Sequence, residues 1–288
     1  MNIVHFFDER TGSLSYLVHK GRIGVVIDPV LDYEPRSACT FTESCDRIAA
    51  AIEELGLTIP YVFETHAHAD HMSGMAYFRK RYGAQGVIGA GIVNVQRVFA
   101  EIYGLGADFP ADGSQFDILA EDGDEIDAGT FMLRALSTPG HTEACMVYQV
   151  EDAVFLGDTL FQPDYGTARC DFSNGSADAL YDSIQRLYAL PGDTRLFACH
   201  DYRPGNRPMH FESTVREQRE TNVQLNQETS REEFVAMRRK RDAELDMPVL
   251  ILPSIQINIR AGEVPEPDKN NRSFLKLPLN VFQGDPSK

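Results

Sequence analysis

The chain of 288 residues is 43% hydrophobic, which is enough to bury a substantial core in one large domain or two small ones. Its 43 acidic and 27 basic side chains give a formal net charge of −16, which opposes binding to nucleic acid or an anionic membrane and favours a small-molecule substrate. The five cysteines form no CxxC pair, which argues against a disulfide framework or a cysteine-rich zinc site.

The first half of the chain predicts a sheet with helices packed on it. Short β-rich runs between turn residues predict antiparallel strands within 3–29. Apolar residues at helical spacing predict a helix over 43–57 that stops at Gly56. A buried strand over 59–65 then leads into a polar loop, and a helix over 75–83 follows it. In this arrangement the loop side chains gather at the end of the strand.

The second half predicts another sheet and a charged C-terminal region. Residues 116–161 contain four or five short runs joined by turn residues. A helix capped by Ser176 and a strand over 194–200 follow, so the order of elements predicts two sheets with helices outside. Residues 213–245 are mostly helical in propensity, and their basic run favours a solvated helix face over nucleic-acid contact. We expect the last 40 or so residues to form a packed tail.

Potential metal ligands concentrate at the ends of predicted strands. Residues 64–71 read ETHAHADH and place three of the eight histidines and an aspartate within six positions. A chance polar loop does not explain this cluster, because four potential ligands have no packing role there. Imidazole nitrogens and carboxylates held on rigid strand ends suit a divalent first-row metal. The candidate ligands are His66, His68, Asp70, His71, His141, Asp158 and His200.

Other residues with possible chemistry have simpler interpretations. A single histidine in a turn is usually a hydrogen-bonding residue, and we place His5, His19 and His210 in that class. Cys170 and Cys199 are expected to be buried or bystander thiols, since neither has the helix N-terminal setting that activates a nucleophile.

Four motifs resemble the metallo-β-lactamase superfamily. They are THAHADH, TPGHT, GDTLF and CHDY, and they carry its metal-binding blocks in order within roughly residues 1–205. The resemblance implies an α/β fold, the four-layer αβ/βα sandwich with two mixed β-sheets, helices outside and the metal site at one edge. We expect one such domain over 1–288, with a C-terminal helical segment and an extended tail over about 205–288.

The resemblance leaves two enzyme branches to weigh. Thioester hydrolases of the glyoxalase II type use the whole ligand set for two metals, whereas persulfide dioxygenases resemble mononuclear non-haem iron enzymes. The segments ARCDF, STV after HDY, and the C-terminal FLKLPLN resemble the dioxygenases more closely. The segment PDYGTARC and the longer tail depart from that pattern. These departures bear on which thiol is the substrate more than on the iron chemistry.

Our hypothesis is an iron-dependent dioxygenase that converts glutathione persulfide, or another low-molecular-weight thiol persulfide, with O2 to sulfite and free thiol. By resemblance, one Fe(II) per chain is bound by the catalytic residues His66, His141 and Asp158. The substrate-binding candidates are Arg169, Tyr202 and Arg260. Arg260 is the weakest of them, and the alternative interpretation is a surface ion pair. The groups expected to surround the iron and orient its ligands are His68, Asp70, His71, His200 and Asp201.

The main alternative is a two-zinc thioester hydrolase of the hydroxyacylglutathione hydrolase type. A nuclease of the same fold is disfavoured by the charge of −16. A non-enzymatic metal-binding protein is also disfavoured, because its complete set of metal ligands would have no catalytic use. We expect a homodimer, no organic cofactor, and no nucleic-acid or membrane partner. Since the chain shows no signal-peptide pattern and no run of about 18 apolar residues, we expect a soluble, cytoplasmic protein.

Overall fold

A computed structural model describes residues 1–172 and 174–281 of the chain. Within these residues, a first six-stranded sheet has the order β1-β2-β3-β6-β8-β9 and a second has the order β10-β11-β12-β13-β14-β15. The first sheet contains β1 (Asn2–Asp8), β2 (Ser13–Lys20), β3 (Ile23–Ile27), β6 (Thr58–Phe63), β8 (Gln85–Gly89) and β9 (Ile118–Ala120). The second contains β10 (Glu125–Asp127), β11 (Met132–Ser137), β12 (Met146–Val150), β13 (Ala153–Phe155), β14 (Arg195–Phe197) and β15 (Glu212–Thr214). A small third sheet contains β4 (Val30–Glu34), β5 (Cys39–Phe41) and β7 (Met72–Ser73).

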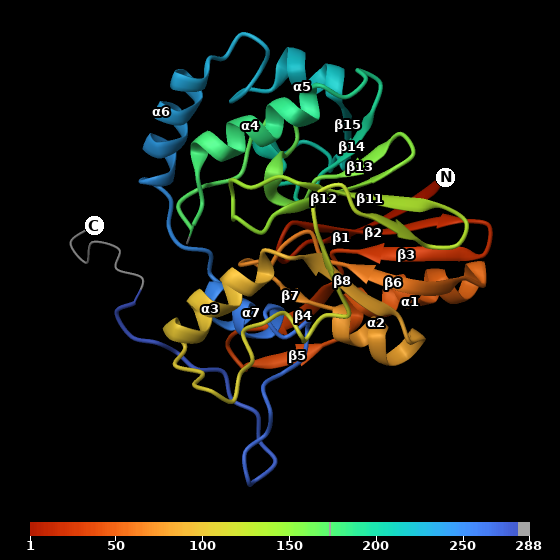
Figure 1. Cartoon of the computed structure of the whole chain (residues 1–288), viewed down its shortest axis with the longest axis vertical. Helices are drawn as coiled ribbons and strands as arrows, with labels where there is room; N and C mark the ends of the chain where they lie inside the picture. The colour runs from red at the N-terminus through yellow and green to blue at the C-terminus, as the bar shows by residue number, and fades with distance from the viewer. Residues whose placement is uncertain (173, 282–288) are drawn as a thin grey trace.

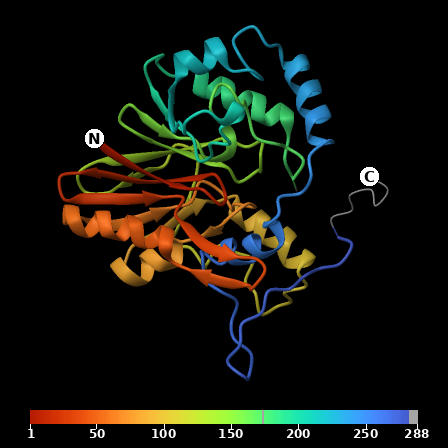
Figure 2. The same cartoon turned by 180° about the vertical axis from the view of Figure 1, so that it is seen from behind.

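Helices cover the outer face of each large sheet, as Figures 1 and 2 show from opposite sides. The helices beside the first sheet are α1 (Glu43–Leu55), α2 (Met75–Tyr82), α3 (Ile92–Ile102) and α7 (Ile251–Asn258). Those beside the second sheet are α4 (Ala177–Tyr188), α5 (Val215–Thr221) and α6 (Arg231–Asp242). The predicted four-layer αβ/βα sandwich is therefore confirmed.

Three apolar clusters hold the layers together. Tyr16 and Phe155 belong to the central cluster between the facing sides of the two sheets. Ile48 of α1 belongs to the cluster beneath the first sheet, and Leu180 of α4 belongs to the cluster above the second. Each fully buried side chain of this size contributes about 1.5–3 kcal/mol of transfer free energy. The sheets are thus fixed against each other, and so are the strand ends that carry the candidate ligands.

Several predicted boundaries agree with the structure for the predicted reasons. α1 and α2 end at Gly56 and Gly83, whose φ angles of 62° and 67° are the left-handed conformation common at helix ends. The Ser176 hydroxyl accepts a hydrogen bond from the backbone N–H of Ala179 at 3.2 Å and so caps α4. Local sequence was sufficient to place these helix ends.

Other segments differ from the predictions. We predict no element for the glycine-rich stretch that forms β8 and α3. β9 pairs with β8 in the first sheet and not with the second sheet, because the edge of β8 is available to it as a parallel partner. The predicted charged helix is divided into α5 and α6, since Ser230 starts a new helix through a capping box with Glu233.

The C-terminal region is only partly a packed tail. α7 is buried, and its Gln256 side chain exchanges two hydrogen bonds of 2.8 Å with the backbone of Lys276. The prediction of packing is wrong for much of the following segment, where Phe274, Leu277 and Leu279 are 61%, 67% and 77% exposed. This segment leaves the body at the lower end of the molecule in Figure 1. The apolar character of Phe274, Leu277 and Leu279 was not by itself evidence that these side chains are buried.

A buried ion pair fixes α6 to the rest of the molecule. The Arg238 side chain donates to Asp242 Oδ1 at 2.8 Å, to the Thr167 carbonyl at 3.2 Å and to Gln224 Oε1 at 3.0 Å. Asp242 Oδ2 accepts a hydrogen bond of 2.9 Å from the backbone N–H of Cys170. α6 is therefore attached to the 167–170 segment, which also contributes to the site described below.

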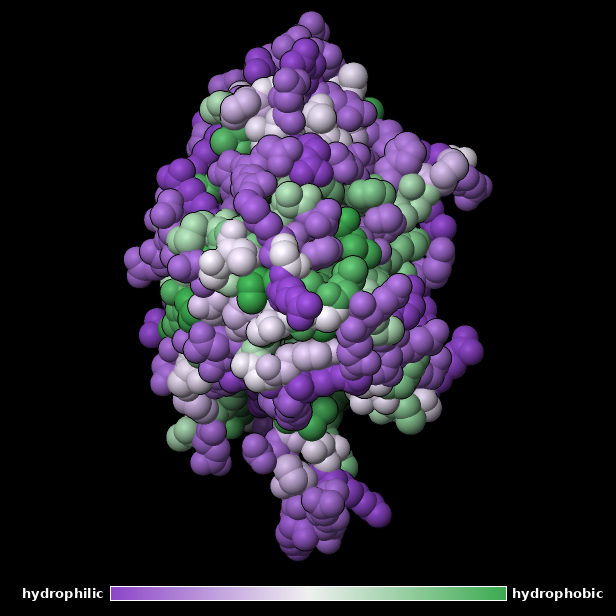
Figure 3. Space-filling view, turned by 90° about the vertical axis from the view of Figure 1, so that its right-hand side faces the viewer, coloured by the Kyte–Doolittle hydropathy of each residue, from purple (hydrophilic) through white to green (hydrophobic). Residues whose placement is uncertain are grey.

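The surface is largely polar, as the high content of charged residues indicates. The face in Figure 3 is mostly hydrophilic, with apolar side chains gathered near its middle. Among the described residues, no helix has both the length and the apolar character that a membrane span requires.

Candidate metal centre

The candidate ligands follow strand ends at one edge of the sandwich. β6 leads into the loop 64–71, and β11 leads into the turn that carries His141. β13 is followed by a short 3-10 helix (Gly157–Thr159) that contains Asp158, and β14 is followed by His200. Five histidines predicted from the sequence thus lie near one another, together with Asp70 and Asp158.

His66, His141 and Asp158 form the first cluster, with one potential ligand atom of each within 4.8 Å of the others. Asp158 Oδ2 lies 3.8 Å from His66 Nε2 and 3.6 Å from His141 Nε2. His66 Nε2 is buried and has no hydrogen-bond partner among the described residues. Buried polar atoms normally have a partner, so this unpartnered nitrogen beside His141 Nε2 and Asp158 Oδ2 fits a bound cation.

Neighbouring groups hold the far side of His66. The backbone N–H of Thr65 donates to Asp28 Oδ1 at 2.7 Å, and the Thr65 hydroxyl donates to Asp28 Oδ2 at 2.9 Å. The same hydroxyl oxygen is 3.1 Å from His66 Nδ1 and is left to accept its proton. That tautomer leaves Nε2 unprotonated, and burial lowers the pKa of His66 well below its usual value.

The other two members of the cluster are held in the same way. His141 Nδ1 donates to the Arg169 backbone carbonyl at 2.8 Å, which leaves Nε2 available. The Cys199 thiol donates to Asp158 Oδ1 at 2.7 Å, so the opposite oxygen, Oδ2, faces the histidines. Gly157 has a φ of 51°, and a Cβ there would lie 2.5 Å from the Thr65 hydroxyl oxygen. A side chain at this position would separate the two loops.

A second cluster lies beside the first and contains His68, Asp70, His71 and His200. His200 Nε2 is 3.1 Å from Asp70 Oδ2 and 3.4 Å from Asp158 Oδ1. His200 Nδ1 is 3.3 Å from the Gly12 carbonyl, and His71 Nδ1 is 3.2 Å from the Ser13 hydroxyl. Nε2 of both histidines is buried without a hydrogen-bond partner among the described residues. This cluster also has the donor set of a metal site.

His68 faces two buried carboxylates. Its Nε2 is 3.2 Å from Asp28 Oδ1 and 3.1 Å from Glu64 Oε2. Burial alone would lower the pKa of His68, but these carboxylates raise it well above its usual value. Burial raises the pKa of Glu64 to about 7, although the contact with His68 opposes the change. His68 is thus fixed by its carboxylate neighbours, and only Nδ1 faces the second cluster without a partner among the described residues.

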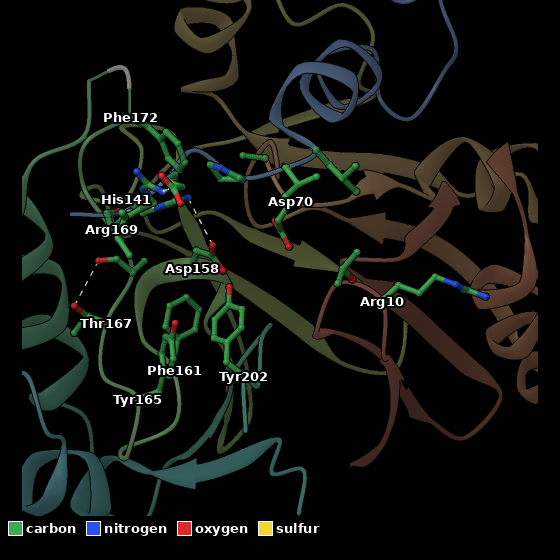
Figure 4. A pocket seen from close by; sticks show the side chains of 18 of the residues that line it. Arg10, Asp70, His141, Asp158, Phe161, Tyr165, Thr167, Arg169, Phe172 and Tyr202 are labelled. Atoms are coloured by element: carbon green, nitrogen blue, oxygen red, sulfur yellow. Dashed lines mark hydrogen bonds and ion pairs between the residues drawn. The ribbon is translucent and has the colours of Figure 1, made fainter. Parts of the chain in front are cut away.

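A cavity of about 770 Å³ opens beside these clusters. His141, Asp158 and Asp70 reach its wall, and Figure 4 shows Asp158 and Asp70 on either side of the space above Tyr202. The Tyr202 ring is stacked on His200, with ring centroids 5.4 Å apart and planes 11° apart. An organic molecule in this cavity would reach both clusters.

The predicted substrate-binding and supporting residues have different surroundings. Tyr202 and Arg169 line the cavity, but the Arg169 guanidinium is occupied by Asp171 at 2.6 and 2.7 Å and by the Asp246 carbonyl at 2.6 Å. Asp201 is buried and accepts hydrogen bonds from Arg207 at 2.7 and 2.8 Å, so it braces the loop after His200.

Arg260 is not among the residues that line the cavity. Its guanidinium lies over the Phe109 ring at 4.7 Å and donates to the Gln256 carbonyl at 2.6 Å. The suggested role in substrate binding therefore has no support in the geometry, because the packing of α7 directs this side chain elsewhere.

Sequence reasoning missed three supporting residues. Asp28 ends a buried strand, which is the same signal that singled out the other ligands, and Glu64 opens the ETHAHADH stretch. Cys199 was expected to be a buried or bystander thiol; it is buried, but its thiol also donates to Asp158. Nothing in the local sequence indicated that contact, since the two residues are 41 positions apart.

The family model of the metallo-beta-lactamase superfamily matches residues 8–200. That range includes all members of both clusters. The chain belongs to this superfamily.

The names of similar proteins differ. A probable metallo-hydrolase of Burkholderia pseudomallei is 46% identical, covering 98% of this chain and 100% of that protein. Glyoxylase B2 of Dictyostelium discoideum is 44% identical, covering 96% and 95%. Human mitochondrial persulfide dioxygenase ETHE1 is 33% identical, covering 89% and 87%. The crystal structure of ETHE1 from Myxococcus xanthus matches with a TM-score of 0.73 at 30% identity, covering 91% and 100%.

Superfamily membership and the two donor clusters together support a metalloenzyme that acts on a small molecule. The superfamily includes more than one reaction, so the metal and the chemistry need a separate argument.

Replacing Cys199 with alanine is expected to weaken metal binding about tenfold, because groups that orient a ligand typically contribute 10- to 100-fold in affinity. Cys199→Ser, which keeps a donor, should retain most of the affinity. Competition titration against a chromogenic chelator under nitrogen measures the change. Cys45→Ala is the matched control, since Cys45 is buried and its thiol donates to the Val30 carbonyl. Equal affinities of Cys199→Ala and the wild type would contradict the assigned contact.

Proposed function

We propose that this protein is a mononuclear iron-dependent persulfide dioxygenase. In the reaction, RSSH, O2 and H2O give RSH and sulfurous acid, which ionises to sulfite. The proposed thiol is glutathione or another low-molecular-weight thiol. The observation that carries the proposal is the convergence of His66, His141 and Asp158, each held on its far side, next to the cavity. Two histidines and one carboxylate are the ligand set of non-haem Fe(II) oxygenases.

The donor atoms fit such an ion. His66 Nε2, His141 Nε2 and Asp158 Oδ2 would hold it, since hydrogen bonds at the opposite atom of each group leave these three atoms facing one another. Bound Fe(II) supplies the redox chemistry by which O2 reacts with a sulfur held beside it. The chain supplies orientation, because Thr65, Arg169 and Cys199 fix the three ligands before the ion binds.

Sequence similarity supports this choice of reaction. The likeness to persulfide dioxygenases extends over most of the chain, and the Myxococcus xanthus structure shares its fold at 30% identity.

A two-zinc thioester hydrolase is the second candidate. The observation in its favour is the second cluster, where Nδ1 of His68 and Nε2 of His71 and His200 are buried without a hydrogen-bond partner among the described residues. A second metal there would share a hydroxide with the first and stabilise the leaving thiolate. The higher identity to the proteins named metallo-hydrolase and glyoxylase B2 agrees with this alternative.

Metal analysis combined with two assays tests the proposal. The protein is purified from cells supplied with iron and zinc, and its metals are measured by mass spectrometry. We expect about one iron per chain, oxygen uptake with glutathione persulfide, one sulfite per O2, and no turnover of S-lactoylglutathione. Two zinc ions per chain with rapid S-lactoylglutathione hydrolysis and no oxygen uptake would establish the alternative instead.

The homodimer, the cytoplasmic location and the single domain over 1–288 remain predictions. Sedimentation equilibrium of the metal-loaded protein tests the first of these.

A further inference from the structure

We propose that a narrow apolar pocket beside His141 is a binding site for O2 and its route to the metal centre, distinct from the larger cavity. The pocket has a volume of about 30 Å³ and is bordered by α3, α7 and the ligand loop 64–71. The inference deepens the proposed function by placing its second substrate, and it rests on that function for the use of O2.

Apolar side chains form most of the wall of this pocket. Val98 and Phe99 come from α3, and Ile251 and Ile255 come from α7, which lies beside α3 in Figures 1 and 2. Well-packed interiors keep few spaces larger than a water molecule. The apolar cavities that do remain stay dry and take up apolar guests such as xenon or benzene. This pocket therefore suits a small apolar molecule.

The size of the pocket selects among the reactants of the proposed reaction. One water-sized molecule needs at least about 10–15 Å³, so a pocket of about 30 Å³ admits a diatomic molecule and excludes a thiol such as glutathione. Water is small enough, but it would lose hydrogen bonds among these apolar side chains. O2 is the reactant that is both small and apolar.

The ligand loop places this pocket next to the metal centre. His66, His68 and Asp70 belong to the two clusters, whereas the intervening Ala67 and Ala69 line the pocket. Both alanines are buried, and a single methyl group at each position leaves space that a larger side chain would fill. The alternation of ligand and alanine in ETHAHADH thus supplies the metal ligands and part of the apolar wall from one stretch of chain.

The pocket and the larger cavity share a wall. Ala69, His141 and Phe172 border both spaces. The Phe172 ring packs edge-on against His141, with ring centroids 5.2 Å apart and planes 80° apart, and Figure 4 shows the two side chains next to each other. A molecule in the pocket therefore lies against the imidazole that would itself hold the metal.

The other end of the pocket lies near the surface. Val95 and Val98 are partly exposed, and Asn174 is exposed and donates a hydrogen bond of 3.1 Å to Glu143 there. A thiol bound in the larger cavity would cover that approach to the metal centre. O2 that enters through the apolar pocket would reach the centre without displacing the thiol.

Xenon binding to the metal-loaded protein tests the pocket itself, because xenon is apolar, comparable in size to O2 and unreactive. We expect crystals pressurised with xenon to show an anomalous peak between α3 and α7, beside His141. Val98→Phe should fill the pocket and abolish the peak, whereas Val98→Ala should keep it. A wild-type crystal without xenon in this pocket would overturn the proposal.

Oxygen kinetics test the route. With saturating glutathione persulfide, Val98→Phe is expected to lower kcat/KM for O2 about tenfold, the lower end of the effect that one added group has in an apolar pocket. kcat/KM for glutathione persulfide, measured at saturating O2, should stay at the wild-type value, and Val98→Ala should keep wild-type O2 kinetics. Equal losses for both substrates in Val98→Phe would show a general disturbance of the centre and would overturn the route.

Val93→Phe is the matched control. Val93 also lies on α3 and is partly buried against the same apolar cluster, but it does not line the pocket. Xenon binding and O2 kinetics should equal those of the wild type. Val95→Phe, one turn from Val98 on the same helix face, is the second filling variant if thermal unfolding shows that Val98→Phe does not fold.

The outcome is separable from that of the proposed reaction. Xenon in the pocket together with no oxygen uptake by the wild type would reject the dioxygenase while supporting the pocket as a site for small apolar molecules. Oxygen uptake with wild-type O2 kinetics in both filling variants would overturn the route and leave the dioxygenase standing.

Discussion

His141→Ala is expected to lower persulfide-dependent oxygen uptake by at least about a hundredfold and to reduce the bound iron to a small fraction of one equivalent. The estimate is a lower bound, because residues that only orient a metal ligand already contribute 10- to 100-fold. The physical reason is the loss of one of three converging atoms, since His141 Nε2 lies 3.6 Å from Asp158 Oδ2. Oxygen electrode traces and metal analysis of the same preparation measure both effects.

His210→Ala serves as the histidine control. His210 is exposed, lies outside both clusters, and only its backbone N–H contacts the site loop, at Asp201 Oδ2. Its metal content and activity should equal those of the wild type. If His141→Ala kept its full complement of iron, the ligand assignment would be wrong, whatever the remaining activity.

Arg238→Ala is expected to lower the free energy of unfolding by about 3–5 kcal/mol, the usual cost of removing one partner of a buried ion pair. Arg238 is 1% exposed, and its loss leaves the Asp242 carboxylate buried without its cation. The effect should extend to the site, because Asp242 holds Cys170 and the neighbouring Arg169 carbonyl holds His141. Urea unfolding followed by circular dichroism measures the loss.

Arg239→Ala is the neighbouring control on α6. Its guanidinium makes an exposed ion pair of 3.3 Å with Asp178, and such pairs contribute about 0–1 kcal/mol. A loss in Arg238→Ala no larger than this would show that the buried pair is not needed for stability. Arg238→Met, which fills the space without a charge, separates packing from the unpaired carboxylate.

The sequence allowed much of the site to be predicted because its ligands are local in pattern. His66 to His71 lie within one loop, and His141, Asp158 and His200 each follow a short apolar run. The loop 64–71 follows a strand of the first sheet and the other three ligands follow strands of the second, so their meeting also requires the two sheets to pack against each other. The glycine and serine helix boundaries were predictable for a similar reason, since caps depend on adjacent residues.

The roles of individual side chains were less accessible. Arg169 carried the resemblance to the dioxygenases, but its guanidinium is bound to Asp171 and its backbone carbonyl holds His141. Arg260 was a candidate for a substrate carboxylate, but it packs on Phe109.

What the sequence alone determined was the kind of chemistry, through a dense set of imidazole and carboxylate ligands in ETHAHADH and at three later strand ends. It also determined the layered α/β fold, because strand and helix periodicities are local properties. Only the tertiary structure decided how each ligand is oriented and which side chains line the cavity beside the ligands. Hydrogen bonds such as those from Cys199 to Asp158 and from Thr65 to Asp28 join residues 41 and 37 positions apart, and no local pattern records which partners folding brings together.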